Sequence, residues 1–136
     1  MSVRNIEQGY FILPNPSDPV EEVPLSFYGA ASTTVIAKFA SNNGTVKLLI
    51  PSFIMTADHT DSLHAAIPSK YIPSESSRLY QFFVLVFNNA IAKGMIQLDM
   101  QGSSISIYPG VTSESIFQVN SMCGLVDYTT LVWNLV

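Results

Sequence analysis

The sequence predicts an all-β domain, an antiparallel β-sandwich of jelly-roll-like form, on three observations. β-branched residues are abundant, with 12 valines, 12 isoleucines and 8 threonines, and these residue types favour strands. Short segments alternate between apolar and polar residues with the period of two that places one side of a strand on a core. Turn residues separate these segments at short intervals. The length of 136 residues suits one such domain.

The first 24 residues are expected to form an extended arm or linker, and residues 25–136 to form the sandwich. Four of the eight prolines fall within residues 14–24, and proline supplies no backbone donor for a helix or a central strand. The apolar run at residues 10–13 is typical of an edge strand or of an anchor on another surface.

After the arm, the expected strands follow one another closely. A turn at Asn42-Asn43-Gly44 joins strands at 33–40 and 45–50, because asparagine and glycine both tolerate positive φ. The clearest hairpin runs from 95–100 through Gln101-Gly102 to 104–108. Its inward residues are expected to be Ile96, Leu98, Met100, Ile105 and Ile107. Further strands are expected at 52–57, 62–67, 115–119 and 128–133.

The segment 79–87 differs from the other strands because it is apolar on both faces. Phe83, Leu85 and Phe87 share one face, and the residues between them are also apolar, although a single sandwich core needs only one of the two faces. Either the chain's own N-terminal arm or other subunits would cover the second face, since an apolar patch of this size is unfavourable on a monomer. Oligomerisation is favoured, and Phe83, Leu85 and Phe87 are the candidate interface residues.

The charge pattern argues against a nucleic-acid partner. The net charge is −4, and the six lysine and arginine residues are spread singly along the chain, whereas phosphate binding needs them clustered. No segment approaches the ~18 apolar residues of a membrane-spanning helix, so no membrane insertion is expected. The N-terminus lacks the apolar core of a secretory signal, which predicts that the chain is made in the cytoplasm and not secreted by the general route.

Catalytic residues, metal ligands and cofactors are not expected. Both histidines fall within residues 58–64, but their spacing fits no established metal site and is more typical of a solvated loop. The single Cys123 has neither histidine close in sequence and is expected to be a small buried hydrophobe. The chain has no Gly-x-Ser-x-Gly motif and no spaced pair of carboxylates, so an enzyme such as a glycan hydrolase is disfavoured.

Several spacings recur together in one known pattern. They are the segments 45–51 and 67–73, the hairpin from Gly94 to Tyr108, and a terminal strand that holds Trp133. In this order the segments resemble the C-terminal head or tip domains of viral fibre proteins, which end phage tail fibres and the collagen-like fibres of large DNA viruses and their satellite viruses. The resemblance covers roughly residues 40–136. The chain has no Gly-X-Y tract and no heptad shaft, so it is either a piece of a longer fibre or a small virion protein.

The resemblance implies a homotrimeric β-sandwich at the virion surface that caps a fibre and binds a host-surface ligand, either a glycan or a protein receptor. Loops such as 57–62 and 109–114 would make the contact, with no individual ligand-binding residue assigned. The alternative is a structural protein, a minor capsid or cementing subunit that docks on other coat proteins through its N-terminal arm.

Overall fold

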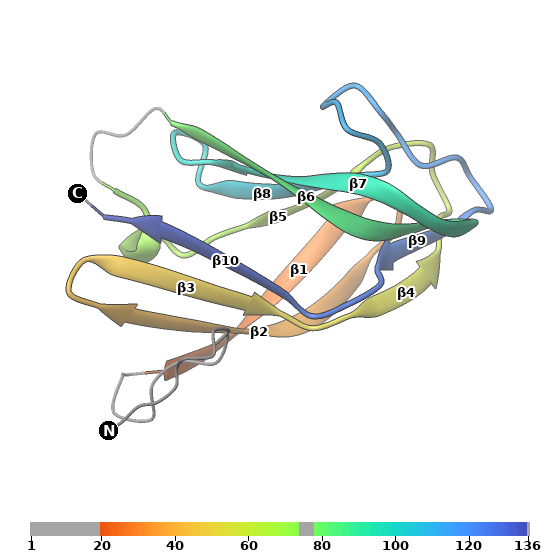
Figure 1. Ribbon diagram of the computed structural model, residues 1–136. Helices are drawn as coiled ribbons and strands as arrows, with labels where there is room; N and C mark the ends of the chain where they lie inside the picture. The colour runs from red at the N-terminus through yellow and green to blue at the C-terminus, as the bar shows by residue number, and fades with distance from the viewer. Residues whose placement is uncertain (1–19, 74–77, 136) are drawn as a thin grey trace.

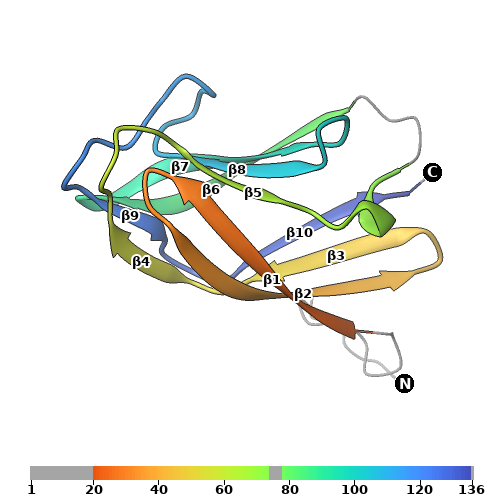
Figure 2. The same ribbon diagram turned by 180° about the vertical axis from the view of Figure 1, so that it is seen from behind.

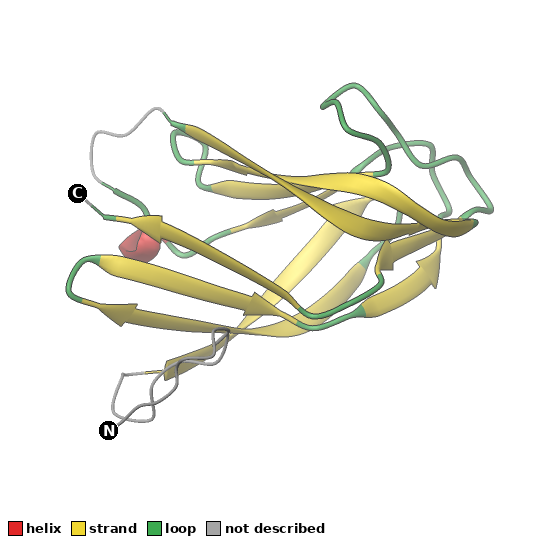
Figure 3. Cartoon of the chain, in the orientation of Figure 1, coloured by secondary structure: helices red, strands yellow, loops and turns green. Residues whose placement is uncertain are grey.

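The computed structural model describes residues 20–73 and 78–135, and this part of the chain is almost entirely β structure (Figure 3). Its strands are β1 (Val20–Gly29), β2 (Thr33–Asn42), β3 (Thr45–Ile50), β4 (Phe53–Thr56), β5 (Leu63–Ala66), β6 (Leu79–Asn88), β7 (Ala90–Asp99), β8 (Ser104–Tyr108), β9 (Met122–Leu125) and β10 (Thr129–Asn134), with a short 3-10 helix η1 (Ser69–Tyr71). All strand pairs are antiparallel, which confirms the predicted all-β, sandwich-like fold. No helix in the described residues is long and apolar enough to cross a membrane.

The strands form two layers (Figures 1 and 2). One layer has the order β10-β3-β2-β1 and the other β5-β8-β7-β6-β9-β4. Strand β1 joins the two layers, because its first part pairs with β2 while Tyr28 and Gly29 pair with β5. A second connection runs through the strand pair β3/β10 of the first layer, which is continued along both chain segments by the pair β4/β9 of the second layer. The sheet therefore curls back on itself around one core.

The core lies between the layers and follows the period-two pattern of the sequence. The inward side chains of the 95–108 hairpin, from Ile96 to Ile107, are all buried as predicted. Aromatic rings stack at two places in this interior: Phe27 on Phe53, with ring centroids 5.4 Å apart, and Phe39 on Tyr71 at 4.4 Å. Burial of these side chains from both layers is the main stabilising contribution to such a fold.

The N-terminal boundary differs from the expected one. Strand β1 begins at Val20, so residues 20–24 belong to a strand rather than to an arm. Pro24 is tolerated there because, among the described residues, this part of β1 pairs on one side, with β2. The rest of the expected arm, including the apolar run at 10–13, lies outside the described residues.

Three smaller differences concern the predicted strands. The expected strand at 115–119 is a loop, held to the rest of the sheet by a single bridge between Phe117 and Asp61. Strand β9 was not predicted, because its short sequence contains Gly124, and glycine is unfavourable in strands. The predicted hairpin arm at 95–100 is the second half of a longer strand, which begins at Ala90 directly after the end of β6 at Asn88.

Candidate functional site

The expected loop at 57–62 meets residues 117–121, which follow the second expected loop at 109–114, at one end of the sandwich. Asp61 and Phe117 exchange two backbone hydrogen bonds, of 3.1 and 2.8 Å. Ala57 donates a backbone hydrogen bond of 2.8 Å to Ser121. The turn between β1 and β2 joins them, because the carbonyl of Ala30 accepts from the backbone N–H of Asp58 at 2.8 Å. This loop end lies opposite the β2–β3 turn in both views (Figures 1 and 2).

Next to these loops, a histidine is held between two serines on the outer face of the sandwich. The Nε2 atom of His64 lies 2.8 Å from the Ser62 hydroxyl, and its Nδ1 atom lies 2.8 Å from the Ser106 hydroxyl. Both serines are buried, whereas the His64 side chain is 25% exposed. Ser106 comes from β8, which pairs with β5 so that Ser106 stands directly opposite His64. The two hydroxyls therefore fix the orientation of the imidazole ring.

Two tyrosines flank the imidazole. The ring of Tyr28, at the end of β1, has its centroid 5.6 Å from that of the His64 ring. The ring of Tyr108 lies edge-on to the same His64 ring, with centroids 6.4 Å apart. Tyr108 is buried, but Tyr28 is 61% exposed. Gly29 permits this arrangement, since a Cβ there would lie 2.2 Å from the carbonyl oxygen of Ser62. We call Tyr28, Asp61, Ser62, His64 and Ser106 the His64 cluster.

The carboxylate of Asp61 completes the cluster. Its Oδ1 accepts a hydrogen bond of 2.7 Å from the backbone N–H of Ser62 and lies 3.6 Å from Nε2 of His64. Asp61, His64 and a serine are also the residue types of a hydrolytic triad. In a triad, however, the serine must reach a substrate, and here both serine hydroxyls are buried. The cluster presents an aromatic ring and a carboxylate to solvent rather than a nucleophile.

The remaining sequence candidates are not part of the cluster. His59 is exposed on the loop, with its Nδ1 atom 3.1 Å from Asp58. Among residues 20–73 and 78–135, no three His, Cys, Asp or Glu side chains are grouped as metal ligands. Cys123 is buried, and burial raises the pKa of its thiol to about 11, with a smaller contribution from Asp58. Sequence reasoning missed the partnership of His64 with Ser106, because 42 residues separate them and only the strand order joins them.

The outer face of β6 and β7 carries several exposed apolar side chains among polar ones, which include the hydrogen-bonded pair Gln81 and Gln97. Phe83 and Leu85, two of the predicted interface residues, are 65% and 45% exposed, while Phe87 is half-buried. Leu79 and Ile91 extend the same face, and both are exposed. We call Leu79, Phe83, Leu85 and Ile91 the apolar strip. The intervening residues of β6 pack against the core, as the two-faced pattern in the sequence predicts.

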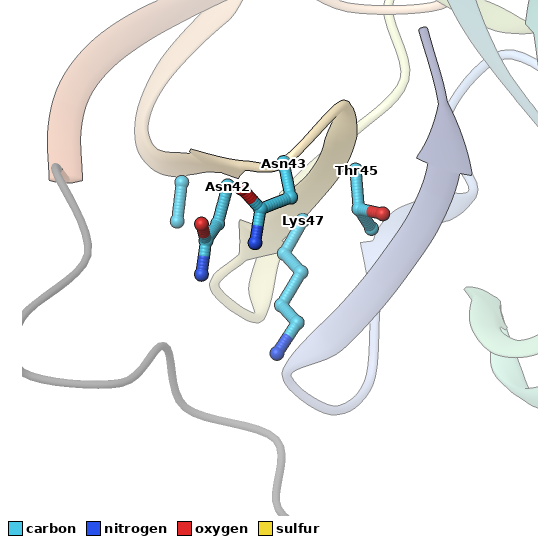
Figure 4. A pocket seen from close by; sticks show the side chains of 5 residues that line it. Asn42, Asn43, Thr45 and Lys47 are labelled. Carbon is cyan, nitrogen blue, oxygen red and sulfur yellow. The ribbon is translucent and has the colours of Figure 1, made fainter. Parts of the chain in front are cut away.

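A pocket lies at the far end of the molecule, on the β2–β3 hairpin (Figure 4). Its polar lining comes from Asn42, Asn43, Thr45 and Lys47. Asn42 and Lys47 already take part in interactions of their own. The turn at its rim has the predicted geometry, with φ of 54° at Asn43 and 80° at Gly44.

Comparison with known proteins gives a structural likeness to a phage protein. No protein-family model and no curated protein matches the chain. The receptor binding protein of Listeria phage PSA is similar in structure, with 19% sequence identity and a TM-score of 0.48. The aligned region covers 85% of this chain and 66% of the phage protein. This chain therefore spans just under two thirds of the length of the phage protein. A likeness of this size assigns neither a family nor an activity to the chain.

Proposed function

We propose that the chain is the head domain of a virion fibre, a homotrimeric attachment module that binds a host-surface ligand. The observation that carries this proposal is the apolar strip on the outer face of a sandwich whose core is already filled. Such a face is unfavourable in water and is typical of a surface that another protein covers. The proposal places the chain at the virion surface, without a catalytic role.

The position of the strip supports burial between copies of the chain. Strand β6 pairs with β7 along its whole length and with β9 at residues 86–88, and the strip lies on the outward side of this β6/β7 pair. Phe83 and Leu85 stand at the middle of this side, and Ile91 faces Phe87 across the strand pair. In a trimer with threefold symmetry, the apolar strips of the three identical chains would face the symmetry axis and bury one another.

The placement of the loops supports a head at the end of a fibre. Strand β1 begins at Val20 near the β2–β3 turn and runs toward the loop end (Figure 1). A shaft joined before β1 would therefore meet the sandwich at one end and leave the loops at 57–62 and 109–121 at the other. This polarity matches the requirements of attachment, since the loop end would face the cell surface.

The test is the solution mass of the full chain, measured by light scattering coupled to size exclusion. We expect a mass near three times the 14.9 kDa of one chain. In Leu85→Asp the introduced carboxylate would lie opposite Lys93 and on a solvent-accessible face, so the chain should fold but remain monomeric. The matched control is Val132→Asp, because Val132 is exposed to 46% on the outer face of the other layer and should leave the trimer intact.

Two results would contradict the proposal. A monomeric wild-type chain would show that the strip needs no second copy, and a virion-docking structural subunit would then explain it better. A trimer that Leu85→Asp leaves unchanged, with circular dichroism confirming the fold of the variant, would place the interface elsewhere.

A further inference from the structure

We infer that the His64 cluster is a binding site for a neutral hexose, with the sugar ring stacked on Tyr28 and its hydroxyls bound by Asp61. This inference rests on the proposed attachment function and names the class of ligand. It comes from the chemistry of three side chains that the structure brings together from β1, β5 and the loop before β5.

Tyr28 supplies the stacking surface. Its ring is 61% exposed, although it lies against His64 on one side. An aromatic face carries partial negative charge and attracts the C–H groups on the apolar face of a pyranose. Large aromatic rings that stand exposed in a defined orientation are effective binding anchors, because little conformational entropy is lost when a ligand covers them.

Asp61 supplies hydrogen-bond acceptors beside the same histidine, and its side chain is 49% exposed. Its carboxylate contacts His64, and an atom at the Cβ position of Gly29 would lie 3.3 Å from Oδ2 of Asp61 and 3.3 Å from Cδ2 of His64. The backbone at Gly29, the residue that follows Tyr28, therefore lies next to both other side chains. A carboxylate accepts hydrogen bonds from two neighbouring sugar hydroxyls at once, and such charge-assisted bonds are the stronger kind.

The site is fixed before a ligand arrives. Ser62 and Ser106 hold both nitrogens of His64, and the backbone N–H of Ser62 holds Asp61. Preorganisation of this kind reduces the entropy cost of binding. Both serines are buried, and their hydrogen bonds position the imidazole beside the exposed Tyr28 ring.

The charge of the loop end selects among sugars. The segments 29–32, 57–62 and 109–121 contain Asp58, Asp61 and Glu114 but no lysine or arginine. Sialic acids, uronic acids and phosphorylated sugars carry negative charge and would meet only like charges among these residues. The geometry therefore favours a neutral hexose over an anionic one.

The test is a glycan array probed with the full chain. The array carries glycans that end in glucose, galactose, mannose or an N-acetylhexosamine, together with sialylated and uronate-containing glycans. We expect binding to one or more neutral glycans. Tyr28→Ala should weaken that binding about tenfold or more, the loss typical of one aromatic anchor. Tyr128→Ala is the matched control, since Tyr128 is exposed to 68% on the segment between β9 and β10 and should leave binding unchanged.

A second variant tests the polar half of the site. Asp61→Asn keeps the size and the oxygen at one position but removes the charge, so it should also weaken the neutral glycan. When Asp61→Asn is combined with Tyr28→Ala, it should not restore the binding that Tyr28→Ala loses. Thermal unfolding of each variant shows whether the fold is retained.

The outcomes separate this inference from the proposed function. A trimer that binds no glycan on the array, or binds only sialylated ones, overturns the hexose site and leaves the trimeric head in place. Binding that Tyr28→Ala does not change also overturns it. A monomer that binds a neutral glycan through Tyr28 supports the hexose site and overturns the trimer.

Discussion

The indole Nε1 of Trp133 donates a hydrogen bond of 2.8 Å to the backbone carbonyl of Tyr71, across 62 residues of sequence. Trp133 belongs to β10, while Tyr71 ends the short helix η1. The Tyr71 ring stacks on Phe39, and its hydroxyl donates a hydrogen bond to Glu21. One tyrosine thereby ties together three strands that lie on the same side of the core.

Trp133→Phe should destabilise the fold by about 2–3 kcal/mol. The substitution leaves the Tyr71 carbonyl without its donor and removes part of a side chain that is 2% exposed. Equilibrium unfolding in urea measures the change. Val132→Ala, at the exposed neighbouring position, should cost well under half as much; equal losses in the two variants would mean that the hydrogen bond contributes little.

Tyr71 should make the stability sensitive to alkaline pH. Burial raises the pKa of Tyr71 from 10.0 to about 12, and the hydrogen bond to Glu21 adds to the shift. Because the folded chain keeps the proton while the unfolded chain loses it, this contribution is fully present below pH 10 and is lost as the pH rises toward 12. The linkage amounts to about 2–3 kcal/mol.

Thermal unfolding at several pH values between 9 and 12 checks this expectation. Tyr71→Phe should flatten the decline of stability in this range, although it should lower the stability at neutral pH. Tyr128→Phe, which alters an exposed tyrosine, should keep the wild-type slope. An unchanged slope in Tyr71→Phe would assign the alkaline loss to other groups.

Gly29→Ala should disrupt the end of β1. The added Cβ would lie 2.2 Å from the Ser62 carbonyl, and the φ of +109° is unfavourable for any other residue. We expect a loss of about 2 kcal/mol or more in the free energy of unfolding, together with separation of Tyr28 from His64. Gly102→Ala is the control, since its nearest neighbour is the end of the flexible Asp99 side chain. Similar losses in both variants would argue against a specific role for Gly29.

Cys123 should react slowly with thiol reagents while the chain is folded. Its side chain is fully buried, and burial raises its pKa from 9.0 to about 11, which lowers the thiolate population about a hundredfold near pH 8. Labelling with a disulfide reagent in buffer and in concentrated urea compares the two states. Fast labelling of the native chain would mean that β9 opens readily from β4 and β6.

The strand pattern could be predicted from the sequence because it is a local property. Alternation placed Ile96 and Ile105 in the core, and the Asn43-Gly44 dipeptide located the β2–β3 turn. The two apolar faces of β6 were also visible, including the exposure of Phe83. The loop at 115–119 was mistaken for a strand, since buried Phe117 gives the same apolar signal in a loop that packs against Asp61.

The His64 cluster could not be predicted because it depends on the order of strands in the sheet. Tyr28, His64 and Ser106 come from β1, β5 and β8, which are neighbours in space but not consecutive in sequence. Each residue is ordinary in its own segment. The only indication of the cluster in the sequence was the proximity of Asp61 to His64. That segment was interpreted as a solvated loop.

The two neighbours of β3 differ greatly in their distance along the chain. Its pairing with β2 closes through the short turn at Gly44, whereas its pairing with β10 joins Ile50 to Thr129. Closing so long a loop is slow, so the β2–β3 hairpin should form before β10 pairs with β3. Until then, the edge of β3 that β10 will cover is exposed. During that interval the free edge can pair with another chain. Refolding should therefore succeed best at low protein concentration, because β10 then pairs with β3 before a second molecule does.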